Sequence, residues 1–286
     1  MTDKRVYKIS FSEFSSFLEC PHKWYLVYIL RFPTDVNEEL VFGGAVHKVI
    51  EEIINKPMLR RKSFLPGVVK SVFKSELAEV KDVNFLTRFT NSHLPYTLVK
   101  QCQELVDKLD FFERFKEYEI IEVEHKLDGF PIVEFPDLIF AFKGYIDLIL
   151  RHKTTGRYLF IDWKTSRKPW DIKVKLRDNP DFFTQLGLYK YFYSKKMDIP
   201  FNLIDVKFFN LPREVPGEQM PYDGILNETY MEFLFNKLQD VCKTIYHSTY
   251  LELDKAKITT KKNFCHRCNH NNEATCNDYD EFQVVI

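Results

Sequence analysis

The sequence predicts an α/β fold in which helices flank a central mixed sheet. Apolar, strand-like runs occur at 138–150 and 157–164, and the patterns at 119–128 and 204–211 predict two further strands. A helical pattern at 181–196 lies between the strands predicted at 157–164 and 204–211. Because strands and a helix follow one another in this part of the chain, we expect one sheet with helices on its faces.

The N-terminal part of the chain is predicted to be helical. Residues 9–31 are typical of a short helix, a break, and a second helix that begins near Pro21, where the missing N–H costs nothing. We expect Gly43-Gly44 to form a tight turn before a helix that runs to Ile54, and residues 64–118 follow a mostly helical pattern. We therefore expect an N-terminal helical region over 1–118.

The rest of the chain divides at a loop. Residues 212–224 are rich in Pro, Gly and acidic side chains, and they separate a sheet-containing core at 119–211 from an amphipathic helix at about 228–247. The segment 212–286 is expected to hold this helix and a cysteine-rich tail. The three segments are expected to form one integrated domain.

Composition and charge narrow the class of protein. Of the 286 residues, 45% are hydrophobic and 29% are charged, which is ordinary for a globular protein. No apolar run approaches the roughly 20 residues that span a bilayer, and no secretory h-region is present, so we expect a cytoplasmic protein without membrane contact. The 41 basic and 41 acidic side chains cancel, which counts against a nucleic-acid binder unless basic clusters at 60–62, 164–177 and 255–262 act locally.

Two carboxylates stand in predicted strands. Asp147 and Asp162 each follow apolar residues, and Lys164 emerges on the same strand face as Asp162. Burying two carboxylates beside an ammonium group is costly without a cation, so these residues predict a divalent metal site suited to phosphodiester hydrolysis. The simpler alternatives are strand-end caps for the aspartates and an ion-pair role for the lysine.

Six cysteines fall into two groups. Cys102 and Cys242 lie on apolar helix faces and are expected to be small buried hydrophobes. Three others lie in a polar tail, and Cys20 is a remote candidate to join them: Cys265, Cys268 and Cys276. In a cytosolic chain the Cys-x-x-Cys spacing of Cys265 and Cys268 is more typical of metal ligation or redox chemistry than of a disulfide. The spacing leaves both zinc and an iron–sulfur cluster open as the bound group.

Together these motifs resemble those of RecB-type nucleases of the PD-(D/E)XK superfamily, in the branch with AddB-type and CRISPR-associated exonucleases that carry an iron–sulfur cluster. The motifs occur in the order typical of the family and extend over nearly the whole chain. The motifs are Ile9 to Tyr25 with its Cys20, Phe42 to His47, Gly144 to Asp147, Asp162 to Lys164, Gln185 to Tyr189, and the three tail cysteines. The resemblance implies a restriction-endonuclease-like fold.

The resemblance also implies roles for individual residues. It implies that Mg²⁺ or Mn²⁺ is bound by His47, Asp147, Asp162 and the backbone carbonyl of Trp163. It implies that Lys164 is catalytic and that Gln185 and Tyr189 position DNA or the active site. It implies a [4Fe–4S] cluster on Cys20, Cys265, Cys268 and Cys276 that joins the tail to the N-terminal helix. Seven residues separate Cys268 from Cys276, longer than the family's spacing, so His270 keeps structural Zn²⁺ as the alternative.

Three assignments keep a structural alternative. A lone histidine such as His47 in an amphipathic helix is usually a satisfied structural residue, and its place after the double glycine favours a ligand. Gln185 and Tyr189 are one turn apart and can be a simple helix-surface pair. Glu124 either reaches the metal site from the first predicted strand or is solvated there.

The sequence therefore predicts a metal-dependent deoxyribonuclease, more specifically an exonuclease on single-stranded DNA ends. DNA repair, recombination, spacer acquisition and phage DNA metabolism are all open as its pathway. The alternative is a catalytically silent nucleic-acid-binding or assembly subunit with the same fold. The helicase motif Gly-x-x-x-x-Gly-Lys-Ser/Thr is missing from the sequence, so a helicase or recombination partner would have to unwind duplex DNA.

Overall fold

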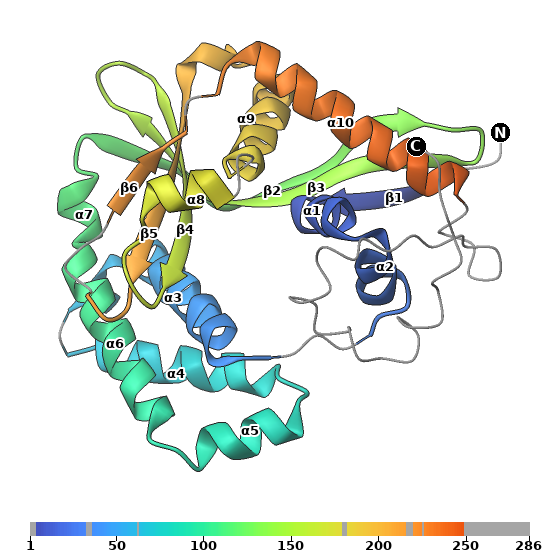
Figure 1. The fold of residues 1–286 in the computed structure, drawn as a ribbon. Helices are drawn as coiled ribbons and strands as arrows, with labels where there is room; N and C mark the ends of the chain where they lie inside the picture. The colour runs from blue at the N-terminus through green and yellow to red at the C-terminus, as the bar shows by residue number, and fades with distance from the viewer. Residues whose placement is uncertain are drawn as a thin grey trace. The chain divides into compact units, whose positions relative to one another are not determined.

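The computed structural model describes residues 4–32, 36–61, 63–178, 182–215, 220–224 and 226–248 (Figure 1). Its strands are β1 (Arg5–Ser10), β2 (Tyr118–Glu134), β3 (Leu138–His152), β4 (Tyr158–Ser166), β5 (Ile204–Pro212) and β6 (Met220–Asp223). Its α-helices are α1 (Phe11–Glu19), α2 (Pro21–Trp24), α3 (Glu38–Asn55), α4 (Leu65–Ala78), α5 (Val83–Thr90), α6 (Leu94–Leu109), α7 (Phe111–Arg114), α8 (Ile172–Asp178), α9 (Thr184–Met197) and α10 (Glu228–His247). Short helical turns are η1 (Tyr25–Ile29), η2 (Pro57–Arg60) and η3 (Phe201–Leu203). Within the described ranges, no helix combines the length and apolar character needed to cross a bilayer.

The strands form a mixed sheet of order β1-β3-β4-β5-β6, with β2 paired to β3. β1 runs parallel to β3, β3 and β4 are antiparallel, β4 and β5 are parallel, and β5 and β6 are antiparallel. The predicted α/β fold, with a central mixed sheet flanked by helices, is confirmed. Among the strands and α-helices of the described residues, those that were not predicted are β1, α8, and β6, which lies within the loop expected at 212–224.

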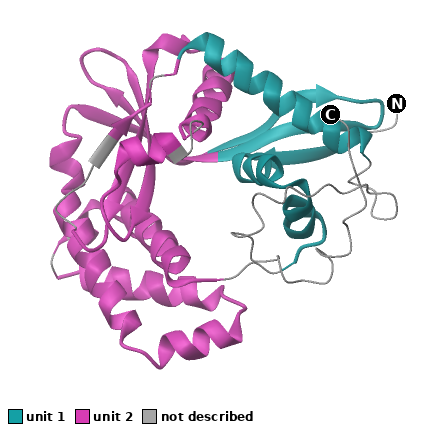
Figure 2. Ribbon diagram, viewed as in Figure 1, with its two compact units in different colours: residues 1–35, 126–144, 227–286 teal, residues 36–125, 145–226 magenta. Residues whose placement is uncertain are grey.

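The chain forms two compact units (Figure 2). Unit 1 contains residues 1–35, 126–144 and 227–286, and unit 2 contains residues 36–125 and 145–226. Strands β2 and β3 contribute residues to both units. All of the candidate nuclease-site residues except the cysteines lie in unit 2, so the site can be described within that unit alone.

Unit 1 begins with a strand where a helix was expected. Residues Ile9 and Ser10 belong to β1, which pairs in parallel with residues 138–143 of β3. Helix α1 starts only after Ser10, which forms a capping box with Glu13: each backbone N–H donates to the other residue's side-chain oxygen, at 2.8 and 3.2 Å. The helix prediction was therefore right for α1 but began too early, because pairing with a distant strand is not visible in the local pattern.

Strand β4 is covered by helices on both faces in unit 2. Leu159, Ile161 and Trp163 are buried in a hydrophobic core with residues of α3, α4 and α6. Phe160 points to the other face, where its ring meets Tyr193 of α9 edge-on at 4.9 Å. Burial on both faces explains why this strand is a continuous apolar run rather than an alternating one.

Helix α3 begins earlier than predicted, and the glycine pair lies inside it. The side chain of Asn37 caps the helix by accepting a hydrogen bond from Leu40 N at 3.0 Å. A Cβ on Gly43 would lie 3.1 Å from Thr165 Oγ1 of β4, and one on Gly44 would collide with the Glu76 carboxylate of α4. The expected tight turn was wrong, because these glycines allow close packing rather than a change of chain direction.

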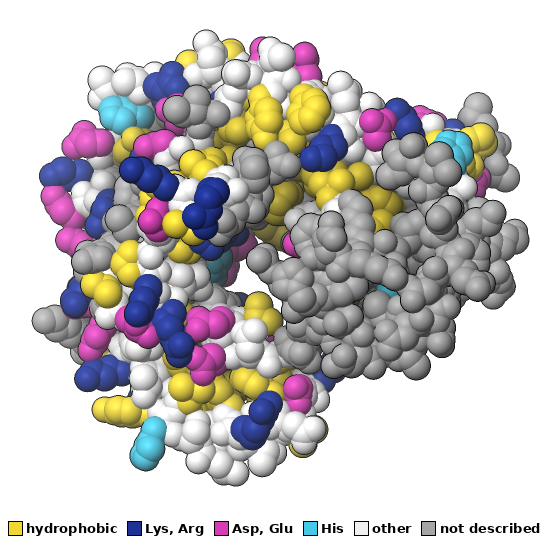
Figure 3. Space-filling view, in the orientation of Figure 1, with side chains coloured by type: hydrophobic (Ala, Val, Ile, Leu, Met, Phe, Trp, Pro, Cys, Tyr) yellow, Lys and Arg dark blue, Asp and Glu magenta, His cyan; other side chains and the backbone are white. Residues whose placement is uncertain are grey.

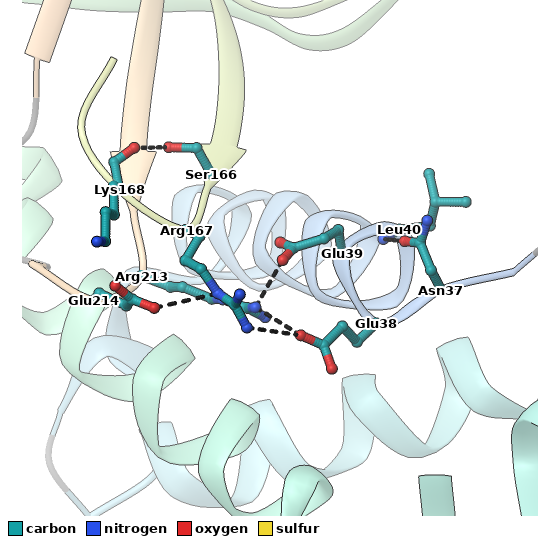
Figure 4. Close-up of polar contacts among 9 residues, drawn as sticks. All are labelled: Asn37, Glu38, Glu39, Leu40, Ser166, Arg167, Lys168, Arg213 and Glu214. Carbon is teal, nitrogen blue, oxygen red and sulfur yellow. Dashed lines mark hydrogen bonds and ion pairs between the residues drawn. The ribbon is translucent and has the colours of Figure 1, made fainter. Parts of the chain in front are cut away.

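The N-terminus of α3 is tied to the ends of β4 and β5 by an ionic network (Figure 4). The buried Arg213 guanidinium binds the carboxylates of Glu38 and Glu39, each at 2.7 Å. Arg167, which follows β4, lies 3.6 Å from Glu38 and 3.2 Å from Glu214. Carboxylates at a helix N-terminus also interact favourably with the helix dipole. The network therefore fixes α3 relative to the strands that carry the candidate site.

Candidate active site

The site forms where β3 and β4 stop pairing. Their antiparallel register ends at Leu148↔Ile161, one residue before Asp147 and Asp162. Since Leu148 and Ile161 both point into the hydrophobic core, strand alternation puts Asp147 and Asp162 together on the opposite face. Beyond the register, the backbone N–H of Trp163 donates to Asp147 Oδ2 at 2.7 Å. The two predicted carboxylates therefore lie on one face of adjacent strands.

Helix α3 brings His47 to this point. Its Nδ1 lies 3.4 Å from Asp147 Oδ2. His47 follows Gly43 by one helical turn, so the close approach of Gly43 to β4 and the position of the imidazole lie on the same helix face. Two of the groups that the resemblance implied as ligands, the His47 and Asp147 side chains, therefore lie close together, and Asp147 is held by the backbone N–H of Trp163.

Glu124 of β2 completes a compact group of potential ligands. One ligand atom each from His47, Glu124 and Asp147 lie within 4.8 Å of one another. Of the two alternatives for Glu124, the structure therefore has the residue reach the site rather than stand in solvent. Asp162 is outside this group of three, and its Oδ2 lies 2.7 Å from Lys164 Nζ.

A chain of polar contacts leads away from Asp162. Lys164 Nζ donates to Gln185 Oε1 at 3.0 Å, and Gln185 Nε2 donates to Tyr189 OH at 3.0 Å. Gln185 and Tyr189 bind each other, as expected for a helix-surface pair, and Gln185 also links this pair to Lys164 of β4. Thus Asp162, Lys164, Gln185 and Tyr189 form one continuous network.

The pKa shifts reveal concentrated negative charge. Burial, followed by the nearby carboxylates of Asp162 and Glu124, raises the pKa of Asp147 well above its usual value. Burial raises the pKa of Glu124 too, with further contributions from Glu51 and Asp162. Burial lowers the pKa of His47, which favours the neutral imidazole that metals bind. The site therefore combines repelling carboxylates with an available nitrogen lone pair.

Asn210 is a site-supporting residue that was not predicted. It is fully buried on β5, opposite Lys164 in the parallel register. Its side chain donates to Lys164 O at 3.3 Å and Ser166 Oγ at 2.8 Å, and accepts from Trp170 N at 3.0 Å. The available signal was a single amide in the apolar run Phe208-Phe209-Asn210-Leu211, since buried polar groups are normally hydrogen-bonded.

A pocket of 440 Å³ gives access to the ligand group. It is lined by Gly43, Gly44, His47, Lys48, Glu51, Glu76 and Glu124. A separate cavity of 380 Å³, lined mainly by apolar residues of α3, α6 and α7, contains none of the candidate residues. The pocket beside His47 therefore offers a route to His47 and Glu124.

Comparison with known proteins identifies the family. The model of the PD-(D/E)XK nuclease superfamily matches residues 8–273. The chain belongs to this superfamily. The crystal structure of a candidate exonuclease from Eubacterium rectale matches with a TM-score of 0.55 and 12% identity, covering 98% of this chain and 90% of that one, which supports the fold. The structure of SSO0001 matches with a TM-score of 0.32 and 13% identity, over 87% of this chain and 91% of that one, too low a score to support the fold. No curated protein gives a significant match.

The site fits the divalent metal that PD-(D/E)XK nucleases use. Carboxylate oxygens are the preferred ligands of Mg²⁺, and an added imidazole suits Mn²⁺ somewhat better. Burial and, after it, repulsion between the carboxylates raise the pKa values of Asp147 and Glu124, and a bound cation would offset both effects. His47, Glu124, Asp147 and Asp162 are therefore the side chains that can hold it.

Only one residue of the predicted cysteine cluster is in the described part of the chain. Cys20 is buried at the junction between α1 and α2, where its backbone caps both helices. Cys265, Cys268 and Cys276, with the alternative ligand His270, lie outside the described residues. Cys102 and Cys242 are fully buried as predicted, and burial raises the pKa of Cys102 to about 12.

Proposed function

We propose that this PD-(D/E)XK nuclease is a divalent-metal-dependent deoxyribonuclease that acts as an exonuclease on single-stranded DNA ends. The observation that carries the proposal is the meeting of His47, Asp147 and the Trp163 backbone beside the Asp162–Lys164 pair. These groups come from α3, β3 and β4, and a purely structural ion pair needs no such convergence. The intact set of side chains argues against a catalytically silent binding or assembly subunit.

In this proposal His47, Asp147 and Asp162 would hold the metal together with the Trp163 carbonyl. A bound Mg²⁺ or Mn²⁺ would lower the pKa of a water molecule and offset negative charge on the phosphate. Lys164 donates a hydrogen bond to the attacking water or to a phosphate oxygen, and Gln185 holds the ammonium group in place. Tyr189 in turn orients the Gln185 amide.

The distribution of charge supports local rather than general attraction of DNA. On the face seen in Figure 3, basic and acidic side chains are interspersed over the helices of unit 2, in keeping with a net charge of zero. In the predicted basic segment 164–177, Lys168 and Lys173 are exposed, and Arg167 is bound to carboxylates. We therefore expect phosphate contacts near the site, with modest dependence on salt.

The wider proposal follows the family resemblance. A [4Fe–4S] cluster on Cys20, Cys265, Cys268 and Cys276 would join the tail to the N-terminal helices, with structural Zn²⁺ as the alternative. We place the protein in the cytoplasm, in DNA repair or recombination, with a helicase or recombination partner that exposes single strands.

Cleavage of end-labelled single strands tests the function. Strands blocked in turn at the 5′ and 3′ ends are incubated with Mg²⁺, with Mn²⁺ and with a chelator. We expect stepwise shortening from an unblocked end, with no product when the chelator is present. Circular single strands that are cut as fast as linear ones would contradict exonuclease action.

The variant Asp162→Asn connects activity to the site. We expect it to abolish cleavage while DNA binding, measured by fluorescence anisotropy, persists. Asp205→Asn is the matched control, since Asp205 is also on the β4–β5 strand pair. Its carboxylate binds Arg157 at a distance of 2.6 Å and takes no part in the candidate site. Full turnover by Asp162→Asn would refute the assignment of this residue.

A further inference from the structure

Glu124 has a backbone conformation that is unusual for its place in the fold. It lies within β2 with φ of 52°, in the left-handed region that side chains other than glycine rarely adopt. In the described ranges the other non-glycine residues with positive φ are Arg31, Asp110 and Asp198, which lie at or just beyond helix ends. Such a conformation costs on the order of 1–3 kcal/mol and persists only where the surroundings impose it.

The strain directs the Glu124 carboxylate to a place without a protein partner. Its neighbours on the same strand are paired: Glu119 binds Arg151, and Glu122 lies 2.7 Å from His125 Nδ1. Within the described part of the chain, the Glu124 side chain makes no hydrogen bond or ion pair. It lies instead within 4.8 Å of the ligand atoms of His47 and Asp147.

The surroundings of this carboxylate have an excess of negative charge. Glu51 and Glu76 line the same pocket, and the pocket's Lys48 lies 3.8 Å from Glu76. Asp162 also acts on Glu124, but its own Oδ2 is 2.7 Å from the Lys164 ammonium. Glu124 is therefore a half-buried carboxylate near an imidazole and a second carboxylate, with no cationic side chain bound to it.

We propose that Glu124 is a further ligand of the divalent cation, in addition to the ligands that the family resemblance supplies. This inference rests on the proposed metal-dependent function of the same site. The charge of Asp162 is partly neutralised by its ion pair with Lys164. Glu124 adds a carboxylate without an ion-pair partner on the side of His47 and Asp147. The added oxygen ligand favours a hard cation such as Mg²⁺ or Mn²⁺.

Mn²⁺ binding to the full chain, without DNA, tests the proposal. Glu124→Gly removes the carboxylate and accommodates positive φ, and Glu124→Gln removes the charge while it keeps the side-chain size. Both variants should weaken Mn²⁺ binding by at least about tenfold, because even the loss of a residue that only supports a metal ligand lowers metal affinity by about 10–100-fold. Calorimetry or the EPR signal of free Mn²⁺ measures the affinity. Glu124→Gly should also melt, without metal, at or above the wild-type temperature.

Glu122→Gln is the matched control, because it removes the same charge from the same strand. Its Mn²⁺ affinity should stay within about twofold of wild type. Wild-type affinity in both Glu124 variants, or an equal loss in the control, would overturn the proposal.

The binding assay is independent of cleavage. If Mn²⁺ binding depends on Glu124 but no DNA is cut, the ligand assignment stands and the nuclease proposal fails. If DNA is cut by a protein whose Mn²⁺ affinity ignores Glu124, the ligand assignment fails and the nuclease proposal stands.

Discussion

Lys164 depends on its neighbours for its orientation. A lysine ammonium group carries three donors on a flexible stem, so its position must be fixed by acceptors. Asp162 Oδ2 and Gln185 Oε1 lie 2.7 and 3.0 Å from its Nζ. One donor then remains for a water molecule or a phosphate oxygen. At the scale of single residues, Gln185 is therefore expected to position Lys164 in the proposed reaction.

Gln185→Leu is expected to lower kcat of DNA cleavage by about 10–100-fold, the usual effect of losing a group that orients a catalytic one. Mn²⁺ affinity should stay near wild type, because Gln185 does not contact the His47–Glu124–Asp147 group. Single-turnover cleavage and calorimetry measure the two effects. Gln185→Glu keeps an acceptor for Lys164 and should recover part of the rate. A parallel loss of Mn²⁺ affinity and rate in Gln185→Leu would show general disruption instead.

At the scale of elements, the packing of α3 against β4 and α4 sets the position of His47. Gly43 faces Thr165, which directly follows Lys164 on β4, whereas Gly44 faces the flexible end of Glu76 on α4. The Arg213 network holds the start of the same helix (Figure 4). A small displacement of α3 therefore changes the distance between His47 and Asp147 without unfolding the helix or the sheet.

The two glycines should respond differently to alanine. In Gly44→Ala the Glu76 side chain can swing away, and alanine favours a helix by about 1 kcal/mol, so the melting temperature should be unchanged or higher. In Gly43→Ala the new Cβ would lie 3.1 Å from Thr165 Oγ1, so either the Thr165 side chain or α3 must move by a small amount. We expect Gly43→Ala to lose turnover with little loss of melting temperature. Full turnover in Gly43→Ala would disprove the requirement for close approach.

At the scale of the whole molecule, the proposed cluster links distant parts of the sequence. Cys20 and Cys265 are 245 positions apart, so a metal that bridges them closes a long loop and constrains the unfolded chain strongly. Cys20 is buried where α1 ends and α2 begins, a position that two helices hold in place. Loss of one ligand there should destabilise more than the local helices.

Cys20→Ser should lose the bound metal and lower the melting temperature. Iron and zinc content, together with visible absorption, measure the first effect, and a brown protein identifies an iron–sulfur cluster. Cys102→Ala is the control: it also removes a buried cysteine, one that lies in the core of unit 2, and should keep the metal. Unchanged metal content in Cys20→Ser would exclude Cys20 as a ligand.

Much of the fold could be predicted because it depends on local periodicity. Helix α10 spans Glu228–His247 as predicted, and β3, β4 and β5 lie within two residues of their predicted ends. The elements that were missed depend on distant partners. β1 is a strand because it pairs with β3, over 130 residues away. Gly43 and Gly44 lie inside a helix, where the absence of a side chain leaves room for Thr165 and Glu76.

The sequence by itself determined which strands carry Asp147, Asp162 and Lys164, and that Asp162 and Lys164 share a face, because side-chain direction in a strand follows from a period of two. The tertiary structure decided that β3 and β4 part at Asp147, that α3 delivers His47 there, and that Glu124 turns toward them. It also decided that Asn210 and Arg213 support the site from β5 and the residue that follows it. These features are contacts between segments that are distant in the sequence, and a local pattern does not specify which distant segment will be its neighbour.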